Sequence, residues 1–280
     1  MASIQTGRLA KPVVRDFSES LWRRLWTDFV YVAVPIVVVL VAWELFARFG
    51  GVPAALFPSV GAVFRALVAM AAEGTLWADI AGTFVRLLKC VIVGAVVGTP
   101  LGALMGYFRS WERALVVPLN FLLAVPGTAL FPLTMLWFGL SEMAILSILF
   151  YEVVLTVMAN TWTGVKSIDL SLIRAGRAFG ATGTSLFWRV LLPAALPSII
   201  SGYRLAFSRA WRILIIAEML VSVGAGLGYR LYWARELFQT DVVYAGLLVV
   251  GIVGLLFERV VLRTAEAMTV NRWGTVRVLD

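Results

Sequence analysis

Two long apolar blocks decide the class of fold: FVYVAVPIVVVLVAWELF, from Phe29 to Phe46, and VVYAGLLVVGIVGLLF, from Val242 to Phe257. The 280-residue chain is 61% hydrophobic, and its mean hydropathy is +0.92. A soluble domain is roughly half apolar, with its apolar residues scattered at helical or strand period. A helix that spans a bilayer needs about 20 mostly apolar residues in a row. We therefore expect an all-α, polytopic membrane protein with little chain left for a separate soluble domain.

Working outward from these blocks, apolar segments of spanning length predict six membrane helices. Their approximate ranges are 29–49, 83–107, 114–138, 143–165, 196–221 and 241–262. The third contains Pro118, Pro126 and Pro132. Helix breakers at membrane depth are tolerated where neighbours or a water-filled cavity satisfy the freed backbone groups. This helix is therefore expected to be broken and interior, either lining a cavity or simply packed.

The distribution of lysine and arginine orients the predicted helices. With the N-terminus inside, fifteen of these residues fall in cytoplasmic segments. The outer segments hold only four, which are Arg48, Arg65, Arg230 and Arg235. Because basic residues crowd cytoplasmic loops, residues 1–28 and 264–280 are predicted to be cytoplasmic tails of an inner-membrane protein. Residues 29–50 are predicted to be a retained first helix rather than a signal peptide, since no small-residue cleavage signal follows them.

The segments beside the second helix carry two packing patterns. Residues 51–80 are predicted to lie outside the membrane, with a short amphipathic helix over Val60–Ala72. The second helix itself, within a core domain predicted over residues 81–263, carries glycines four residues apart. They are Gly94, Gly98, Gly102 and Gly106. Small residues at this spacing let membrane helices approach closely, so they predict a packing seam.

Composition excludes several classes of function. The net charge of +8 fits cytoplasmic loops better than a nucleic-acid site, because no basic surface stands clear of the apolar segments. The single cysteine, Cys90, lies in an apolar stretch and is expected to be a small core residue. There is no histidine, which is the commonest general base and metal ligand. We predict no catalytic residue, no metal site and no cofactor in this chain.

The loop between the fourth and fifth helices, residues 166–193, contains the most informative motif. From Ser171 to Gly202 the chain reads SLIRAGRAFGATGTSLFWRVLLPAALPSIISG. Apolar residues alternate with Arg174 and Arg177 in an amphipathic start, and Gly180 breaks that helix. Such a short helix is either a simple surface helix or a shape that a soluble partner grips.

This loop resembles that of importer permeases of the ATP-binding-cassette class. Their pattern is Glu-Ala-Ala, three residues, Gly, nine residues, Ile, one residue and Leu-Pro. This chain has Arg174-Ala175-Gly176, then Gly180, Val190, Leu192 and Pro193, so every spacing fits and three residue types depart. In the family this loop is the coupling helix that docks in a groove of the ATPase subunit. The resemblance therefore assigns coupling to one set of residues: Arg174, Ala175, Gly176, Arg177, Phe179, Gly180, Leu192 and Pro193.

The resemblance covers roughly Leu56 to Arg263 and extends to the permeases for taurine, alkanesulfonates, nitrate and bicarbonate. It rests further on the proline-rich segment Pro118–Glu142, on Arg209-Ala210-Trp211 with Ala217-Glu218, and on Gly226-Leu227-Gly228-Tyr229. It implies a type I importer fold, a permease homodimer, two cytoplasmic ATPase subunits that hold ATP and Mg, and an extracytoplasmic substrate-binding protein. It also implies a small solute, often an anion.

The chain has no phosphate-cradling loop of its own. Such a loop needs Gly-Lys followed by Ser or Thr, and none of Lys11, Lys89 and Lys166 follows a glycine. If transport is driven by ATP, a separate chain must supply the ATPase.

Charged residues at membrane depth mark the second candidate site. They cost about 2.5–3.5 kcal/mol each by insertion scales and normally face protein or water. Two interpretations stay open, an interhelical ion pair of Glu152 with an arginine of the fifth helix and a cationic lining for an anionic solute. The candidate pathway residues are Glu152, Arg204, Arg209, Arg212 and Glu218, with Pro126 at the helix break and Trp137 as a gate or an interfacial aromatic.

Two other classes of function compete with the ATP-driven importer. A secondary transporter or channel would explain the spans and the buried charges, but not the spacing of the loop. An intramembrane enzyme would need a constellation of reactive groups, and the sequence has no histidine, one cysteine and no clustered carboxylates.

Overall fold

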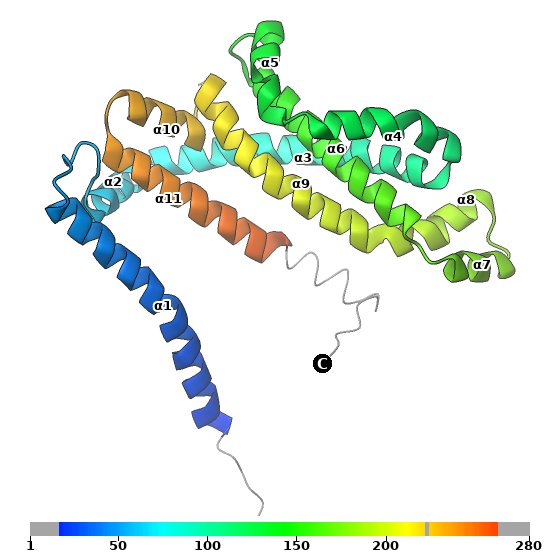
Figure 1. The fold of residues 1–280 in the computed structure, drawn as a ribbon, viewed down its shortest axis with the longest axis horizontal. Coiled ribbons are helices and arrows are strands. Elements are labelled where there is room, and N and C mark those ends of the chain that lie inside the picture. The colour runs from blue at the N-terminus through cyan, green and yellow to red at the C-terminus, as the bar shows by residue number, and fades with distance from the viewer. Residues whose placement is uncertain (1–16, 222–223, 263–280) are drawn as a thin grey trace, which may run out of the picture. The chain divides into compact units, whose positions relative to one another are not determined.

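The computed structural model describes residues 17–221 and 224–262, and within these ranges it contains helices and no strand. The predicted tail residues 1–16 and 264–280 lie outside the described residues. The chain divides between Val60 and Gly61 into two compact units, which are described separately. Figure 1 shows the helices in chain order. Their bounds are α1 Phe17–Phe49, α2 Val60–Ala72, α3 Thr75–Tyr107, α4 Arg109–Ala124, η1 Gly127–Leu130, α5 Phe131–Phe138, α6 Glu142–Lys166, α7 Leu170–Ala178, α8 Gly183–Leu186, η2 Phe187–Leu191, α9 Leu192–Val221, α10 Leu227–Glu236, α11 Thr240–Leu256 and η3 Phe257–Leu262.

The first unit is built on α1, which contains the predicted span 29–49 but begins at Phe17, within the predicted tail. After α1 the chain turns back, and polar contacts hold the turn. The Trp43 indole N–H donates to the Pro58 carbonyl at 2.9 Å, and the Val60 N–H donates to the Glu44 carboxylate at 2.9 Å. The Phe57 ring lies 5.1 Å from that of Phe46 and 5.6 Å from that of Trp43.

The second unit opens with the predicted amphipathic helix, which is confirmed as α2 with the same bounds. Its buried face is Val63, Ala66 and Met70, at helical spacing. Gly74, with φ of 79°, ends the segment, and α3 starts at Thr75. The helix therefore starts earlier than the predicted residue 83, while the location of residues 51–80 outside the membrane stays a prediction. Its first two turns contain the charged residue Asp79, which interrupts the apolar run from which the start was predicted.

The glycine seam of α3 packs against α6 as predicted. A Cβ added to Gly98 would lie 2.8 Å from the Val154 carbonyl oxygen and 3.0 Å from Val157 Cβ. The other three glycines would meet Val153, the Met158 carbonyl and Val165 of the same helix. Two more small residues, Gly164 and Gly202, bring α6 and α9 equally close, since their added Cβ atoms would lie 2.5 Å from Ser198 Cβ and 2.6 Å from Asn160 Cβ. Helices α3, α6 and α9 thus form the core through backbone approach.

The predicted helix over residues 114–138 is broken, as expected. It forms α4 and η1–α5, which are bent by 84°. The break is at Pro126 alone, because Pro118 lies inside α4 and Pro132 occupies the first turn of α5. The Tyr151 hydroxyl of α6 donates to the Leu122 carbonyl at 2.6 Å, which satisfies one acceptor at the open end of α4.

The predicted fourth, fifth and sixth spans correspond to α6, α9 and α11. The fifth starts earlier than expected, because helical turns run without interruption from Gly183 to Val221 over 39 residues. Pro193 therefore does not set the start of this helix. Apolar residues that were assigned to the loop continue it as the π-helical turn η2. The sixth ends in a second such turn, η3.

Four described helices are long and apolar enough to cross a membrane, and the bent pair would make a fifth span. The first predicted span lies in α1, part of whose side chains fall outside the described residues. Six spans therefore stay a prediction. Within the second unit, α7 and α8 lie at one end of α9 and α10 lies at the other (Figure 1).

Candidate functional site

The motif-bearing loop folds as a capped helix, α7. At its start the Asp169 carboxylate accepts a hydrogen bond from the Ser171 backbone N–H at 2.7 Å. At its end Gly180 has φ of 84°, a left-handed conformation that favours glycine. The Gly180 N–H donates to the Arg177 carbonyl at 3.0 Å, and the Ala181 N–H donates to the Gly176 carbonyl at 3.0 Å. This is the paired 5→2 and 6→1 pattern of a Schellman motif, so the predicted stop at Gly180 is confirmed.

The side chains of α7 are exposed to solvent on both its polar and its apolar face. None of its residues is buried, and the Phe179 side chain at its end is 91% exposed. Of the predicted coupling residues, Arg174 to Arg177 lie on α7, Phe179 and Gly180 form its end, and Leu192 and Pro193 form the first turn of α9. Gly176 faces η2, since a Cβ there would lie 3.0 Å from a Val190 methyl group. Two of the positions that depart from the family pattern, Gly176 and Val190, are therefore neighbours.

The cap of α7 gives a pH prediction. Hydrogen bonds from Ser171, chiefly from its backbone N–H, lower the pKa of the Asp169 carboxyl below its usual range. A lowered folded-state pKa means that the cap stabilises α7 fully above the unfolded value of about 3.9 and loses this contribution as the pH falls through the lowered value. We expect hydrogen-exchange protection of the first α7 amides, corrected for the intrinsic rate, to fall in that acidic window. The D169A variant should lack the protection at every pH, whereas D169N should retain it without the acid dependence. An unchanged pH profile in D169N would contradict this assignment.

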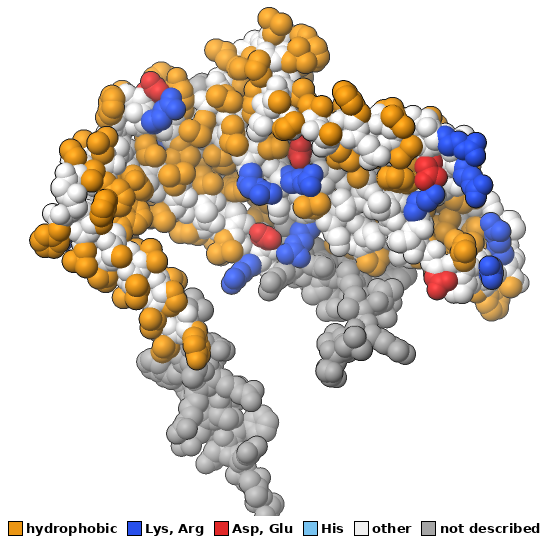
Figure 2. Space-filling view, viewed as in Figure 1, with side chains coloured by type: hydrophobic (Ala, Val, Ile, Leu, Met, Phe, Trp, Pro, Cys, Tyr) orange, Lys and Arg blue, Asp and Glu red, His pale blue; other side chains and the backbone are white. Residues whose placement is uncertain are grey.

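A second candidate site lies midway along α9. The α9 charge cluster consists of Glu152 on α6, Arg204, Arg209 and Arg212 on α9, and Glu258 after α11. Figure 2 shows basic and acidic side chains gathered in the middle of one face. Arg209 lies 3.7 Å from Glu152, and Arg204 lies 3.4 Å from Glu258. The expected ion pair between Glu152 and an arginine of the fifth helix is therefore present.

The Arg209–Glu152 pair adjoins the broken helix. A Cβ on Gly127, the first residue of η1, would lie 3.1 Å from a Glu152 carboxylate oxygen. The pair of Glu152 and Arg209 therefore lies beside the residue that follows Pro126, so these three candidate pathway residues are close together. Trp137 lies elsewhere, near the end of α5, with its side chain 65% exposed.

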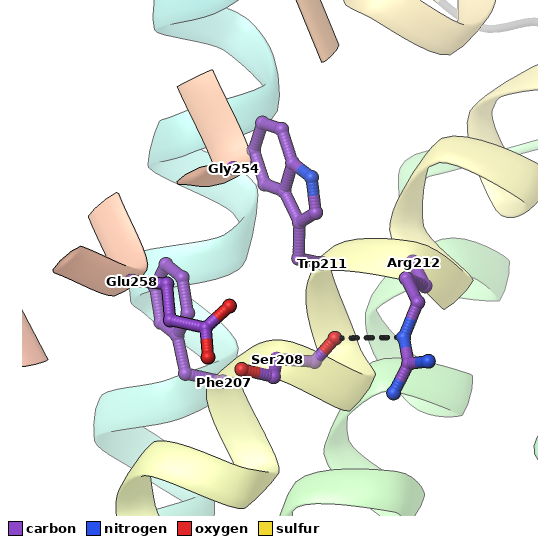
Figure 3. Close-up of a pocket in the computed structure, with 6 residues that line it drawn as sticks. All are labelled: Phe207, Ser208, Trp211, Arg212, Gly254 and Glu258. Carbon is purple, nitrogen blue, oxygen red and sulfur yellow. Dashed lines mark hydrogen bonds between the residues drawn. The ribbon is translucent and has the colours of Figure 1, made fainter. Parts of the chain in front are cut away.

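Arg212 differs from its two neighbours in the cluster. Its Nε donates to the Ser208 carbonyl at 3.2 Å, and among the described residues no carboxylate pairs with its guanidinium. It lines a cavity of about 310 Å³ together with Phe207, Ser208, Trp211, Gly254 and Glu258. In Figure 3, Ser208 lies between the Glu258 carboxylate and the Arg212 side chain.

Glu218, the remaining candidate of the pathway set, belongs to a buried network. Its side chain is 0% exposed, and Arg86 Nη1 donates to it at 2.7 Å. The other carboxylate oxygen, Oε2, accepts from the Thr83 hydroxyl at 2.9 Å and from the Gly228 N–H at 3.0 Å. Glu218 and Arg204 are near one face by spacing, but 14 residues of α9 separate them by about 21 Å along the helix axis, so they belong to different sites. In this conformation Glu218 lines no open surface.

The network also holds the turn that precedes α10. Asp79 accepts from the Gly226 N–H at 3.1 Å and from Arg230 Nε at 2.7 Å. The Leu227 N–H donates to the Thr83 hydroxyl, which in turn donates to Glu218. We name Asp79, Thr83, Arg86, Glu218 and Arg230 the Glu218 clamp. Sequence reasoning missed four of its members, although Asp79, Thr83 and Arg86 stand at i, i+4 and i+7, one polar stripe at helical spacing.

The clamp needs the two glycines that start α10. A Cβ on Gly226 would lie 2.7 Å from the Glu218 carboxylate, and one on Gly228 would meet the Ile215 carbonyl. The Gly-Leu-Gly of the sequence is therefore explained by close packing over a buried carboxylate. Among the described residues, no group of three His, Cys, Asp or Glu side chains is placed to hold a metal ion.

Residues 98–274 match the family model described as the binding-protein-dependent transport system inner membrane component. The chain belongs to this family. It is therefore a multi-pass permease component of the inner membrane, and the resemblance inferred from the loop is confirmed at the level of the family. The matched range includes α7, the α9 charge cluster and the turn into α10, but begins after the clamp residues of α3.

Three relatives cover most of the chain. An Escherichia coli protein named as an aliphatic sulfonates transport permease is 36% identical over 225 residues, which are 80% of this chain and 85% of that protein. A Methanocaldococcus jannaschii protein named as an ABC transporter permease is 34% identical over 232 residues, or 81% and 86% of the two chains. The taurine transport system permease protein of E. coli is 32% identical over 186 residues, or 66% and 67%.

A solved structure supports the fold. The chain resembles one chain of an inward-facing structure of the MetNI methionine ABC transporter, with a TM-score of 0.61 and 21% identity. The match covers 72% of this chain and 97% of the other. The fold is therefore that of an ABC importer permease.

Proposed function

We propose that this permease carries a small anionic solute as the membrane-spanning part of an ATP-driven importer. Two copies would form the path, and two separate cytoplasmic ATPase subunits would hold ATP and Mg. An extracytoplasmic binding protein would deliver the solute. The relatives named for sulfonate and taurine transport support an anionic solute, as does a bicarbonate transport permease of Synechococcus elongatus that is 28% identical over 190 residues.

The exposed charge in the middle of α9 carries this proposal. Arg204 to Arg212 occupy the central turns of a 30-residue helix, and Arg212 is exposed on the surface of the single chain. A charged side chain facing lipid at that depth would cost about 2.5–3.5 kcal/mol or more. The cluster must therefore face water or protein in the assembled transporter. A second copy facing this surface across a water-filled path would provide both.

The surface of α7 supports docking of an ATPase. A solvent-exposed aromatic such as Phe179, on a helix capped at both ends, is a rigid apolar anchor of the kind found at the centre of protein interfaces. When ATP binding closes the ATPase dimer, α7 would move with it and turn the cavity outward to accept solute. ATP hydrolysis would reset the inward-facing state. This arrangement needs α7 on the cytoplasmic side, which agrees with the excess of basic residues there.

The lysines support a division of labour between chains. Lys89 lies 3.3 Å from Glu142, and Lys166 lies 2.7 Å from Glu112. Both therefore serve as ion-pair partners between helices, and neither follows a glycine as a phosphate-binding lysine would. ATP hydrolysis is accordingly assigned to the partner subunit.

The proposal is tested by co-purification from detergent-solubilised native membranes. The tagged wild-type chain is expected to retain an ATPase in roughly equal amount. The G180V variant should lose it, because a β-branched residue is strongly disfavoured at a φ of 84° and the end of α7 would unwind. The matched control is G139V, which places the same strain at a φ of 67° before α6, where nothing crowds the side chain.

The outcomes distinguish coupling through α7 from transport without an ATPase. ATPase retained by wild type and G139V but lost from G180V supports coupling through α7. Retention by G180V would contradict the role of α7. A wild-type chain that purifies alone, and moves solute into vesicles without ATP, would overturn the importer and favour a secondary transporter.

A further inference from the structure

Arg212 is the one arginine of the α9 charge cluster that has no carboxylate partner among the described residues. Its neighbours Arg204 and Arg209 are each held by a glutamate, at 3.4 and 3.7 Å. Arg212 donates a hydrogen bond through Nε, and its acceptor is the Ser208 carbonyl one turn earlier on the same helix. The two terminal nitrogens thus remain free to donate to another group. A guanidinium presents these donors in a planar fork that matches an oxyanion.

The cavity beside Arg212 has the size and walls of a small-molecule site. Its volume of about 310 Å³ is near the lower end of the range for ligand pockets. Phe207 and Trp211 provide an apolar wall, and Phe207 is fixed in place by stacking on Phe257 at 4.2 Å between ring centroids. Gly254 leaves the space that the indole occupies, because a Cβ there would lie 2.7 Å from Trp211 Nε1. The shape of the cavity is therefore fixed by close packing of α9 against α11 and the turn that follows it.

The charges of the cavity are asymmetric. Arg212 lies on one side and the Glu258 carboxylate on another, with Ser208 between them in Figure 3. Glu258 is 48% exposed and is held by Arg204. A ligand with one negative group can place it on Arg212 and its apolar part on Phe207 and Trp211. A ligand with a second negative charge would bring that charge toward Glu258, which repels it.

We propose that this cavity binds a small organic monoanion, such as a short sulfonate or carboxylate. The anionic oxygens lie on the terminal nitrogens of Arg212, and the carbon part lies on the Phe207–Trp211 wall. The inference rests on the proposed function for its biological meaning, since it names the place in the permease where the anionic solute is held. The cavity discriminates against dianions, because the Glu258 carboxylate repels a second negative charge.

Accessibility of a cysteine at position 208 tests this without any partner protein. Ser208 lines the cavity and accepts from Arg212 through its backbone carbonyl, which S208C leaves in place, so this variant is a mild change. The full chain, in membranes and with the buried Cys90 replaced in C90S, is treated with the anionic reagent sulfonatoethyl methanethiosulfonate or with its cationic trimethylammonioethyl counterpart. Ethanesulfonate and inorganic sulfate serve as competing probes.

The expected result is a preference for the anionic reagent and protection by ethanesulfonate at lower concentration than by sulfate. Adding R212Q should raise the ethanesulfonate concentration for half-protection about tenfold or more, the loss expected for a hydrogen bond to a charged group. The matched control R65Q removes the same charge from an exposed position on α2 and should change nothing.

Three results would overturn the inference. They are a cysteine at position 208 that reacts with neither reagent, equal protection by sulfate and ethanesulfonate, and protection that R212Q leaves unchanged. None of these bears on ATP-driven import, because the labelling needs neither ATPase nor binding protein. Failure of the co-purification test would conversely leave the labelling result standing.

Discussion

Replacing Arg86 with methionine is expected to destabilise the folded permease by about 3–5 kcal/mol, the cost of leaving a buried charge without its partner. Arg86 donates to Glu218 at 2.7 Å and to the Ala225 carbonyl at 2.8 Å, so the variant strands a carboxylate that is 0% exposed. The change is measured as the shift in the unfolding transition in mixed detergent micelles, followed by circular dichroism.

The double variant R86M/E218Q separates the charge from the packing. It keeps the side-chain volumes but removes both charges, so it should be more stable than R86M alone. If R86M and the double variant unfold together, the stranded charge is not the source of the loss. R235Q is a useful reference, since that arginine is an exposed neighbour of Glu236 and its loss should cost little.

The second large effect is expected from G102A in the seam between α3 and α6. An added Cβ would meet the Met158 carbonyl oxygen and would lie 2.7 Å from Thr161 Cβ. A backbone carbonyl and a Cβ atom cannot turn aside as the end of a long side chain can, so the two helices must separate. We expect a loss of about 1–3 kcal/mol in the same unfolding measurement, as for other overpacked cores.

The matched control is G251A in α11. A Cβ at Gly251 meets nothing within 4 Å, so the same change should be neutral or stabilising by up to about 1 kcal/mol through helix propensity. Equal destabilisation of G102A and G251A would show that the loss comes from glycine replacement in general and not from the seam.

Sequence predicted those features that depend on local spacing. The four glycines of α3 gave the seam, Gly180 gave the end of α7, and Val60–Ala72 gave α2. Pro126 gave the helix break. Pro132 is tolerated because a proline in the first helical turn loses no hydrogen bond, whereas Pro118 stays inside α4 and could not be distinguished from Pro126 by sequence.

Features that depend on contacts between distant segments were missed. The Glu218 clamp joins residues 132 to 151 positions apart, so no local window contains it. Its polar residues also explain why α3 was predicted too short. Hydropathy counts Asp79 and Arg86 as costly to bury, but in the structure their hydrogen-bond and ion-pair partners remove that cost. The pairing of Arg209 with Glu152 could be anticipated as a type of contact, but the isolation of Arg212 emerged only from the distances.

The helix runs without a break from Gly183 to Val221 over 39 residues, about 58 Å at 1.5 Å per residue. Its far end is held by the ion pair of Glu218 with Arg86, three residues before the helix ends. Its near end contains the π turn Phe187–Leu191, the one wide turn along it, next to α7. A load applied at α7 should therefore be transmitted along this helix to the end held by the Glu218 clamp, which carries α10 along with it. The stiffness of this helix, rather than a series of side-chain rearrangements, would then determine how far a displacement of α7 on one side of the membrane is transmitted toward the other side.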